Sequence, residues 1–551
     1  MSFLDSITQS LDRYPHSLIV ELDDERRAAT GPELTRRIAD VRAALRAGGI
    51  SRGDRVVILS RNSIEWACAD LAIMLEGAIA VPLYARQTVA ELAVILRDAS
   101  PALILCETDE QRDAITGAWD SCPPIRRFAD VEPHDRPLEE RVLPVDRPVT
   151  IFYTSGTSGE PKGVVLSMRN VTHIVECAAS HLDRLMAGRP ATERVFHYLP
   201  FCFAGSWILL LSSLTRGATL SLNVDLTRIV DDLSAVKPHY FQNVPVLLDR
   251  MRSGVEQAIR RRGGFGRLLD QARRAHSARR AGSRPALGDA IGGFFASRLL
   301  LPIVRRKLGT ELRALICGSA PLSDETREFF ELLALPVLQV YGLTETTAIC
   351  TMDAPGVPTR GGVGTVVRDV EMRLSDEGEI LVRGPNVFAG YWNRSEATRD
   401  AFTNGWFRTG DLGEVDAHGH WHILGRIKNL VVLASGHNVA PEPLEQSLAA
   451  LVPEAHQIVV LGTGRPYLTM LVTGDVDASA VEAAADRLNA SLPHYQRIRG
   501  TLLSREPLSI ESGLLTANGK LRRDAIARRF AGELDRLYAS TREPTETVAR
   551  A

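Results

Sequence analysis

From its start to about residue 345, the chain alternates short apolar runs with stretches of helical periodicity. The runs lie at 54–60, 101–106, 218–222, 239–243, 312–317 and 336–341. Short apolar, β-branched runs are typical of buried strands, and strands that alternate with helices are typical of a sheet covered by helices. The pattern predicts a layered α/β core.

Two different patterns follow this core. Segments 370–374 and 379–383 flank a turn at 376–378, and segments 413–415 and 420–424 flank a turn at 416–419, so both pairs predict antiparallel hairpins. Beyond residue 426, a helix at 441–449 precedes strands at 457–461 and 467–472 and further helix, which predicts a small α+β domain. We place the domains at residues 1–425 and 426–551.

Composition excludes several classes of protein. With 551 residues, 45% of them hydrophobic, the chain has material for at least two domains. The 65 Lys and Arg residues balance 67 Asp and Glu residues, so no global charge favours nucleic acid, and no nucleic-acid partner is expected.

Seven scattered cysteines and the lack of a signal-like N-terminus predict a cytoplasmic protein. Apolar runs such as 207–214 are too short to cross a bilayer, so no membrane-spanning helix is predicted.

Segment 153–163, Tyr-Thr-Ser-Gly-Thr-Ser-Gly-Glu-Pro-Lys-Gly, directly follows a strand-like run. Its glycines allow the backbone to turn, its hydroxyls are hydrogen-bond donors, and Lys162 adds a positive charge, all of which suit a bound phosphate. The spacing differs from a Walker loop, which needs four residues between its glycines. Taken alone, the segment is more typical of a flexible, solvated surface turn.

Four further motifs favour a nucleotide. Small residues at 318–322 follow a strand and would allow a flat base to lie against the backbone. Segment 339–346 supplies Tyr341 for stacking, and Thr344 and Glu345 as oxygen ligands of the kind that Mg²⁺ takes. Asp411 follows a tight turn and could accept both ribose hydroxyls. Cations at 425–429 and 518–523 lie on the predicted small domain. Each of the four motifs, taken alone, is also typical of an ordinary turn or surface segment.

Together and in this order, these segments resemble the adenylate-forming superfamily of acyl-CoA synthetases, peptide-synthetase adenylation domains and luciferases. The matching pieces are 153–163, 318–322, 339–346, 405–411, 425–428 with 435–441, and 516–520, so the resemblance spans the chain. It implies a large N-terminal domain of layered α/β subdomains with a small β-barrel-like part, and a small mobile α+β C-terminal domain. Long-chain fatty acyl-CoA synthetases look most similar.

The resemblance also implies a role for each matching residue. Tyr341 and 318–321 would flank adenine, Asp411 and Arg426 would hold the ribose, Glu345 would ligate Mg²⁺, and Lys520 would bridge the carboxylate and the α-phosphate. The complete set of implied nucleotide-binding residues is Thr154, Ser155, Gly156, Thr157, Lys162, Gly318, Ser319, Ala320, Pro321, Gln339, Tyr341, Gly342, Asp411 and Arg426, with Thr344, Glu345 and Lys520 in catalysis. Lys428 matches the hinge, and Gly436 and His437 match the acceptor side.

The implied reaction joins a carboxylate to the α-phosphate of ATP, which requires Mg²⁺ and lysine to neutralise charge and hold the reactants in line. A second nucleophile, the thiol of coenzyme A, then attacks the acyl adenylate. The expected acyl pocket contains Phe203, Trp207 and Val244, so the acid is expected to be hydrophobic. Many relatives carry histidine at the position of Phe203.

Two alternatives stay open at this point: transfer of the acyl group to an amine or a carrier-protein thiol, and nucleotide binding without catalysis. The arginine-rich segment 251–309 could attract a membrane surface or an acidic carrier protein, although such segments are more often solvated helix faces.

Overall fold

In the computed structural model, the described residues are 1–119, 121–134, 143–155, 160–188, 190, 192–261, 265–320, 322–356, 359, 361–510, 512–515 and 520–540. The chain divides into two compact units. Unit 1 comprises 1–373, 381–409 and 415–422, and unit 2 comprises 374–380, 410–414 and 423–551. The domain boundary that the sequence suggested at 425/426 stays a prediction.

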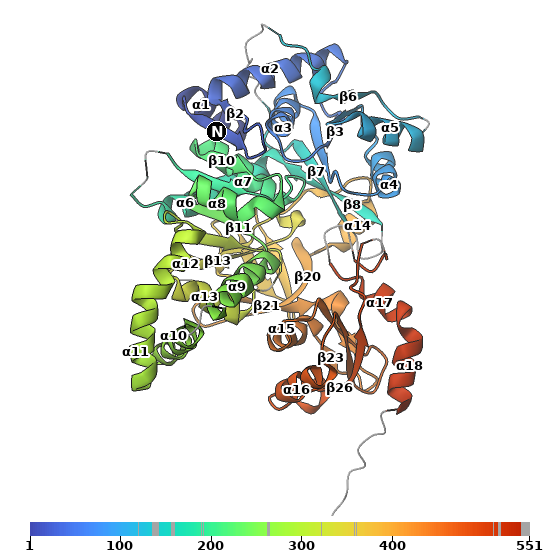
Figure 1. Cartoon of the computed structure of the whole chain (residues 1–551). Helices are drawn as coiled ribbons and strands as arrows, with labels where there is room; N and C mark the ends of the chain where they lie inside the picture. The colour runs from blue at the N-terminus through green and yellow to red at the C-terminus, as the bar shows by residue number, and fades with distance from the viewer. Residues whose placement is uncertain are drawn as a thin grey trace, which may run out of the picture. The chain divides into compact units, whose positions relative to one another are not determined.

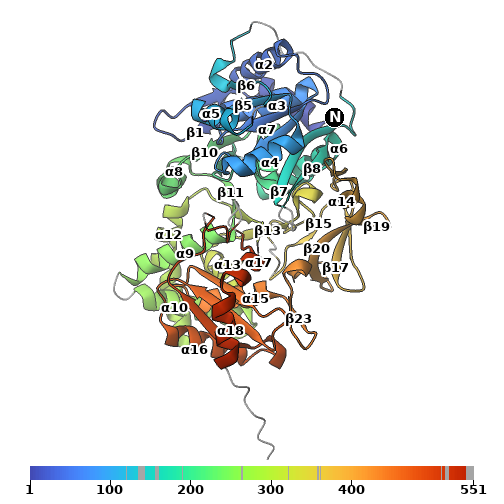
Figure 2. The same cartoon turned by 90° about the vertical axis from the view of Figure 1, so that its right-hand side faces the viewer.

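A seven-stranded sheet forms the first layer of unit 1. Its order is β18-β8-β7-β4-β3-β5-β6, with parallel pairing from β7 to β6 and antiparallel pairing of β8 with both neighbours. The strands are β3 (Arg55–Leu59), β4 (Ile79–Leu83), β5 (Leu103–Cys106), β6 (Ile125–Arg127), β7 (Pro148–Ser155), β8 (Pro161–Ser167) and β18 (Gly390–Tyr391). Helices α3 (Ile64–Glu76), α4 (Val89–Ala99) and α5 (Asp109–Ala118) follow β3, β4 and β5, so this part consists of consecutive βαβ units (Figure 2).

A nine-stranded sheet forms the second layer, in the order β15-β14-β13-β12-β11-β9-β10-β1-β2. Its strands are β1 (Ser17–Glu21), β2 (Ala28–Thr30), β9 (Arg194–His197), β10 (Thr219–Leu222), β11 (Tyr240–Asn243), β12 (Ala314–Cys317), β13 (Val337–Tyr341), β14 (Thr351–Met352) and β15 (Thr365–Val366). Its helices are α1 (Phe3–Arg13), α2 (Gly31–Ala47), α6 (Met168–Leu185), α7 (Ala204–Arg216), α8 (Ile229–Val236), α9 (Pro245–Arg260), α10 (Phe265–Arg280), α11 (Leu287–Phe295), α12 (Leu301–Leu308) and α13 (Asp324–Leu332) (Figure 1). The six strands predicted before residue 345 are all present.

The two predicted hairpins belong to a five-stranded sheet. Its members are β16 (Glu371–Leu374), β17 (Glu379–Arg383), β19 (Phe402–Thr403), β20 (Trp406–Val415) and β21 (Trp421–Arg426), and α14 (Ser395–Asp400) lies beside β19. The turn of the second hairpin is closed by Asp416, whose side chain accepts from the backbone N–H groups of His418 and His420. An Asx-type turn of this kind is what the sequence Asp-Ala-His-Gly favours.

Unit 2 is built on the three-stranded sheet of β24 (Gln457–Leu461), β25 (Leu468–Thr473) and β26 (Ile498–Ser504). Alternate residues enter two cores: Ile458 and Val460 pack towards α15 (Pro441–Leu451) and α16 (Ala478–Asn489), and Val459 and Leu461 towards α17 (Arg523–Arg529) and α18 (Ala531–Ser540). A two-stranded ribbon, β22 (Val431–Val432) and β23 (Asn438–Val439), joins the first core. Because successive side chains of a strand point to opposite faces, β24 contributes to the cores on both faces of the sheet. The predicted α+β composition is confirmed.

A carboxylate lies in the apolar core of unit 1. Asp70 on α3 is fully buried, and its Oδ2 accepts from the indole N–H of Trp207 at 2.7 Å. The other oxygen, Oδ1, has no hydrogen-bond partner among the described residues. Burial raises the pKa of Asp70 to about 7, because the indole N–H only partly compensates for the lost solvation.

We predict that Asp70→Asn makes the folded chain less sensitive to pH. The folded state holds the Asp70 proton up to about pH 7, whereas an unfolded chain releases it near pH 4, so wild-type stability is lost as the pH rises through that window. The free energy of unfolding of the variant should therefore rise relative to that of the wild type as the pH increases between those limits, by roughly 4 kcal/mol at most. Thermal unfolding midpoints of both proteins against pH measure the gain, and a difference that does not change with pH would contradict the prediction.

Trp207→Phe provides the complementary variant. It removes the only side-chain donor to Asp70 found in the described part of the chain, so the pKa of folded Asp70 should rise further and the loss of stability should continue to higher pH, with a loss of about 1–3 kcal/mol relative to the wild type at pH 8.

Candidate active site

The predicted phosphate segment connects two antiparallel strands, β7 and β8. Thr154 is opposite Lys162 and Ser155 is opposite Pro161, and the Thr154 hydroxyl donates to the Lys162 carbonyl at 3.5 Å. Gly156, Thr157 and the side chain of Ser155 lie outside the described residues. The described parts of the segment therefore belong to two antiparallel strands, which differs from the strand-to-helix connection of a Walker loop.

Gly163 has a packing role that the sequence did not reveal. A Cβ atom at this position would lie 2.8 Å from the Ile151 side chain and 3.1 Å from Cβ of Trp392. The Trp392 N–H also donates to the Gly163 carbonyl at 2.7 Å. Glycine is required here because Ile151 on the neighbouring β7 and Trp392 after β18 leave no room for a side chain, whereas the sequence suggested that the glycines of this segment serve to turn the backbone.

Tyr391 links the cation and the acid of the predicted site, and the sequence analysis missed it. It pairs with Val164 on β8, so its ring shares a sheet face with Lys162, whose Nζ lies 5.2 Å from the ring centroid. The Tyr391 hydroxyl donates to Oε1 of Glu345 at 2.9 Å. Burial, with the adjacent Glu345 carboxylate, raises the pKa of Tyr391, so the phenol stays protonated and keeps this bond.

The loop after β13, residues 343–350, is held by the segment 385–391. Phe388 donates its backbone N–H to the Glu345 carbonyl at 2.8 Å, and the Asn386 side chain donates to the Ile349 carbonyl at 2.9 Å. Thr347 donates its hydroxyl to the Asn386 carbonyl at 2.8 Å. Asn386 is fully buried, so these bonds are shielded from water, and they fix the backbone that carries Thr344 and Glu345.

The predicted adenine-flanking residues lie where β12 and β13, adjacent parallel strands, end. Gly318, Ser319 and Ala320 follow β12, Tyr341 ends β13 with 9% of its surface exposed, and Gly342 follows it. Pro321 lies outside the described residues. Ser319, Thr347 and Ala348 have positive φ angles of 74°, 53° and 73°, an unfavourable conformation that is frequent at ligand sites.

Gln339 is a buried residue of the sheet. It is 3% exposed, and its backbone N–H donates to the buried Asp353 carboxylate at 2.8 Å. The other Asp353 oxygen accepts from the Thr359 N–H at 2.8 Å, and burial raises the pKa of this carboxyl group. The structure therefore shows how Gln339 supports the strand, and its predicted contact with nucleotide stays a prediction.

The predicted acyl-pocket residues separate into two groups. Phe203 packs its ring 5.8 Å from that of Tyr84, and Val244 is half-buried, with its N–H donating to the Tyr198 hydroxyl at 3.4 Å. Trp207, by contrast, is fully buried between Phe3 and Phe152 and bonded to Asp70. The structure places Trp207 in the core, on a helix that is buried at nearly every position, and its assignment to the acyl pocket stays a prediction.

Gln242 on β11 is a further residue that the sequence did not single out. Its Nε2 lies 3.0 Å from the position of a Cβ on Gly205, and its buried Oε1 has no partner among the described residues. It is therefore a polar group near the start of α7, the helix that follows Phe203.

In unit 2, the two residues expected to hold ribose are in direct contact. Nε of Arg426 donates to Oδ1 of Asp411 at 2.9 Å, and Asp411 is 3% exposed whereas the arginine side chain is 46% exposed. The N–H of the neighbouring Gly410 donates to the Glu379 carboxylate at 3.0 Å. Asp411 lies within β20 and not directly after a tight turn as the sequence suggested. The aspartate is oriented by the strand and by a cation, an arrangement that suits hydrogen bonding to a diol.

The remaining predicted residues of unit 2 lie on turns. Lys428 is exposed on the short 3₁₀ turn η5 (Ile427–Asn429), and Gly436 and His437 are exposed in the turn between β22 and β23. The His437 ring stacks on Tyr495, with centroids 4.5 Å apart. Lys520 is exposed beside a bridge between Leu515 and Leu521, and residues 516–519 lie outside the described chain.

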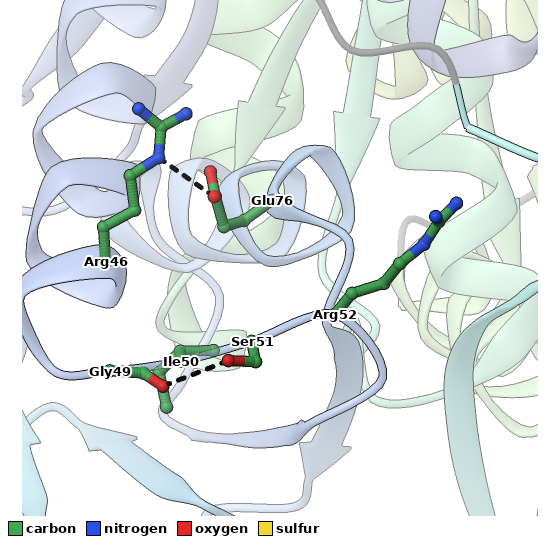
Figure 3. A pocket seen from close by; sticks show the side chains of 6 residues that line it. All are labelled: Arg46, Gly49, Ile50, Ser51, Arg52 and Glu76. Atoms are coloured by element: carbon green, nitrogen blue, oxygen red, sulfur yellow. Dashed lines mark hydrogen bonds and ion pairs between the residues drawn. The ribbon is translucent and has the colours of Figure 1, made fainter.

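A surface hollow of about 360 Å³ lies elsewhere, at the ends of α2 and α3 (Figure 3). It is lined by Arg46, Gly49, Ile50, Ser51, Arg52 and Glu76, none of which was predicted to act in the site. Glu76 already accepts from Arg46 at 2.9 Å and from the buried Arg42 at 3.1 Å. The hollow is therefore lined by a structural ion-pair network. No group of three or more metal-ligating side chains is found among the described residues.

Comparison with known proteins identifies the family. A family model described as AMP-binding enzyme matches residues 7–392, and one described as AMP-binding enzyme C-terminal domain matches residues 428–542. The long-chain-fatty-acid–CoA ligase FadD15 of Mycobacterium bovis is 30% identical over 89% of each chain. Long chain acyl-CoA synthetase 3 of Arabidopsis thaliana is 27% identical over 91% of this chain and 85% of its own.

The fold is shared with solved enzymes. The o-succinylbenzoate CoA synthetase MenE of Bacillus subtilis, solved with its acyl-adenylate intermediate, superposes with a TM-score of 0.74 at 21% identity, covering 95% of this chain and 97% of its own. This likeness confirms the predicted α/β class with a large N-terminal and a smaller C-terminal part. Since the first family model spans more than half of the sequence, and a relative at 30% identity spans 89% of it, the chain belongs to the AMP-binding enzyme family.

Proposed function

We propose that the protein activates a long-chain fatty acid with ATP and transfers the acyl group to coenzyme A. Adenylate-forming acyl-CoA ligases use ATP, Mg²⁺ and coenzyme A. The relatives named as long-chain acyl-CoA ligases support the fatty acid and the coenzyme A thiol over an amine or a carrier-protein thiol. The observation that carries the proposal is the triad of Lys162, Tyr391 and Glu345 at the base of the β7–β8 hairpin.

The residues of this triad fit a nucleotide with its metal. Oε1 of Glu345 accepts from Tyr391, and no hydrogen-bond partner of the other oxygen is found among the described residues. Carboxylate and hydroxyl oxygens such as those of Glu345 and Thr344 are ligands that Mg²⁺ takes, and bound Mg²⁺ would offset phosphate charge. Lys162, over a neutral ring, keeps its ammonium group available for a phosphate oxygen.

Unit 2 supplies the other proposed roles. Asp411, positioned by Arg426, is suited to hold the ribose hydroxyls, and Lys520 is proposed to neutralise charge as the fatty carboxylate attacks the α-phosphate. Attack forms the acyl–phosphate bond and releases pyrophosphate; the thiol then forms the thioester and releases AMP. Lys428 is the proposed hinge, and Gly436 and His437 the proposed acceptor side.

The acid is proposed to contact Phe203 and Val244, which are apolar and half-buried. A cytoplasmic location is kept as part of the proposal, since all seven cysteines are free, as in a reducing compartment.

The reaction is tested by exchange of pyrophosphate into ATP over a panel of carboxylic acids. Long-chain acids should support exchange, and addition of coenzyme A should yield an acyl thioester and AMP. If ATP binds but no acid supports exchange, a non-catalytic nucleotide-binding protein is the better explanation; an amide or carrier-bound product would overturn the choice of acceptor.

Lys520→Ala should lower adenylate formation by about a hundredfold or more, because one charge-stabilising donor is lost. Reaction of preformed acyl adenylate with coenzyme A should stay largely intact. Arg522→Ala removes an exposed cation two residues away and is the matched control. Equal losses in both half-reactions would rule out this division of roles.

Tyr391→Phe tests whether the hydroxyl positions Glu345. The variant keeps the ring beneath Lys162 but loses the hydrogen bond, so exchange should fall about tenfold, with a higher Mg²⁺ requirement and an unchanged KM for the acid. Tyr153→Phe is the control, since it removes a similar bond from the same sheet, to Asp98 at 2.7 Å. If the two variants show the same Mg²⁺ dependence, Tyr391 has only a structural role.

A further inference from the structure

Helix α11 continues through a π-helical turn, η3 (Ala296–Leu300), into α12, and forms one apolar helix from Leu287 to Leu308. By length and composition this helix could cross a membrane, which corrects the expectation that no segment of the chain is long enough. Only 28% of its most apolar window is buried in the protein. An exposed helix this apolar requires an explanation, because soluble surfaces rarely display contiguous apolar patches.

One face of the helix is packed against the rest of unit 1. Its buried residues recur at every fourth position: Gly292, Ala296, Leu300, Val304 and Leu308. A Cβ on Gly292 would overlap the Gln271 side chain of α10 at 2.0 Å, so the two helices are in close contact, side by side in Figure 1. A helix that spanned a bilayer would have to give up this face, which argues against a spanning role.

The adjoining face, roughly 100° around the helix from the buried one, is exposed and apolar. Its side chains are Leu287 (78% exposed), Ile291 (50%), Phe294 (55%), Phe295 (47%), Leu299 (54%) and Ile303 (46%). These six make up a third of the exposed large hydrophobic side chains in the described part of the chain, and they include both exposed phenylalanines. We call this set the α11–α12 face.

Basic side chains lie on the face and at its C-terminal end. Segment 251–309 contains fourteen Lys and Arg residues against three Asp and Glu residues, in a chain whose formal net charge is −2. Arg298 lies on the face, with its guanidinium 5.4 Å from the Phe294 ring, and Arg306 and Lys307 are exposed at its C-terminal end. The one acid in the helix, Asp289, is 18% exposed and paired with Arg274.

We propose that the α11–α12 face binds the surface of an anionic phospholipid membrane, with the helix lying in the plane of the interface. Aliphatic and phenylalanine side chains enter the acyl boundary, while arginine and lysine contact the headgroups. A second copy of the chain is disfavoured as the occupant, because two faces of the same positive charge would repel each other. An acidic carrier protein would satisfy the charge but not the continuous apolar stripe.

This inference goes beyond the proposed reaction, and its test does not depend on activity. The wild-type chain is incubated with vesicles of phosphatidylcholine and phosphatidylglycerol, or of phosphatidylcholine alone, and sedimented. We expect binding to the anionic vesicles, weakened by salt, and at least tenfold weaker binding to the neutral ones.

Paired variants separate the two contributions. Phe294→Gln with Leu299→Gln keeps every charge and should weaken binding about tenfold or more at all salt concentrations. Arg306→Gln with Lys307→Gln should weaken binding several-fold at low salt and little at high salt. Leu226→Gln with Val230→Gln alters two side chains of similar exposure (56% and 61%) outside the face and should bind as the wild type does. Unchanged melting temperatures verify that each variant is folded.

Insertion itself is observed with Phe295→Trp, whose fluorescence should shift to shorter wavelength on anionic vesicles. The proposal is overturned if the wild type does not sediment with anionic vesicles, or if Phe294→Gln with Leu299→Gln binds them as the wild type does. It is also overturned if that variant instead abolishes self-association in size-exclusion chromatography, or abolishes binding to an acidic carrier protein while vesicle binding persists.

Discussion

The short antiparallel pairing of β18 with β8 is the constraint on which the arrangement of the candidate site in unit 1 depends. Through it, segment 385–391 contacts the hairpin that carries Lys162, and through Asn386 and Phe388 it contacts the loop that carries Glu345. Asn170 anchors the same segment from α6 by donating to the carbonyls of Pro385 and Val387, both at 2.8 Å. Two loops from different sheets are thereby held by one frame.

Tyr391 also determines how the two charges of the site relate to each other. Lys162 and Glu345 are both described, and the structure shows no ion pair between them; each contacts the tyrosine instead, one the ring and the other the hydroxyl. A direct ion pair would neutralise both groups and would have to be broken before phosphate or metal could bind. The neutral aromatic residue therefore keeps opposite charges near each other and available, which is a form of preorganisation.

Sequence patterns predicted the fold well and the site only partly. The strands before residue 345, both hairpins and the α+β composition of unit 2 could be predicted because burial follows periodicity. Tyr391 and Asn386 could not, since their roles depend on contacts between segments far apart in the chain; the only local signal was the run Gly-Pro-Asn-Val-Phe-Ala-Gly-Tyr-Trp at 384–392. The hydrogen bond of Trp207 could not be predicted either, because an aromatic residue on an apolar helix has the same local pattern in a core as in a pocket, and its partner Asp70 is 137 positions away.

The π-helical turn at Ala296–Leu300 has a consequence for register. Positions four apart drift steadily around a regular helix of 3.6 residues per turn, yet five such positions stay buried from Gly292 to Leu308. The wider turn absorbs this drift, beside Pro302, which lacks the amide hydrogen that a regular helix would use. Loss of one residue there would rotate everything downstream by roughly 100° without altering composition. The π-helical turn therefore determines that aromatic and basic side chains lie on the same side of this helix. A variant that lost the turn would keep nearly the same amino-acid composition but not this arrangement.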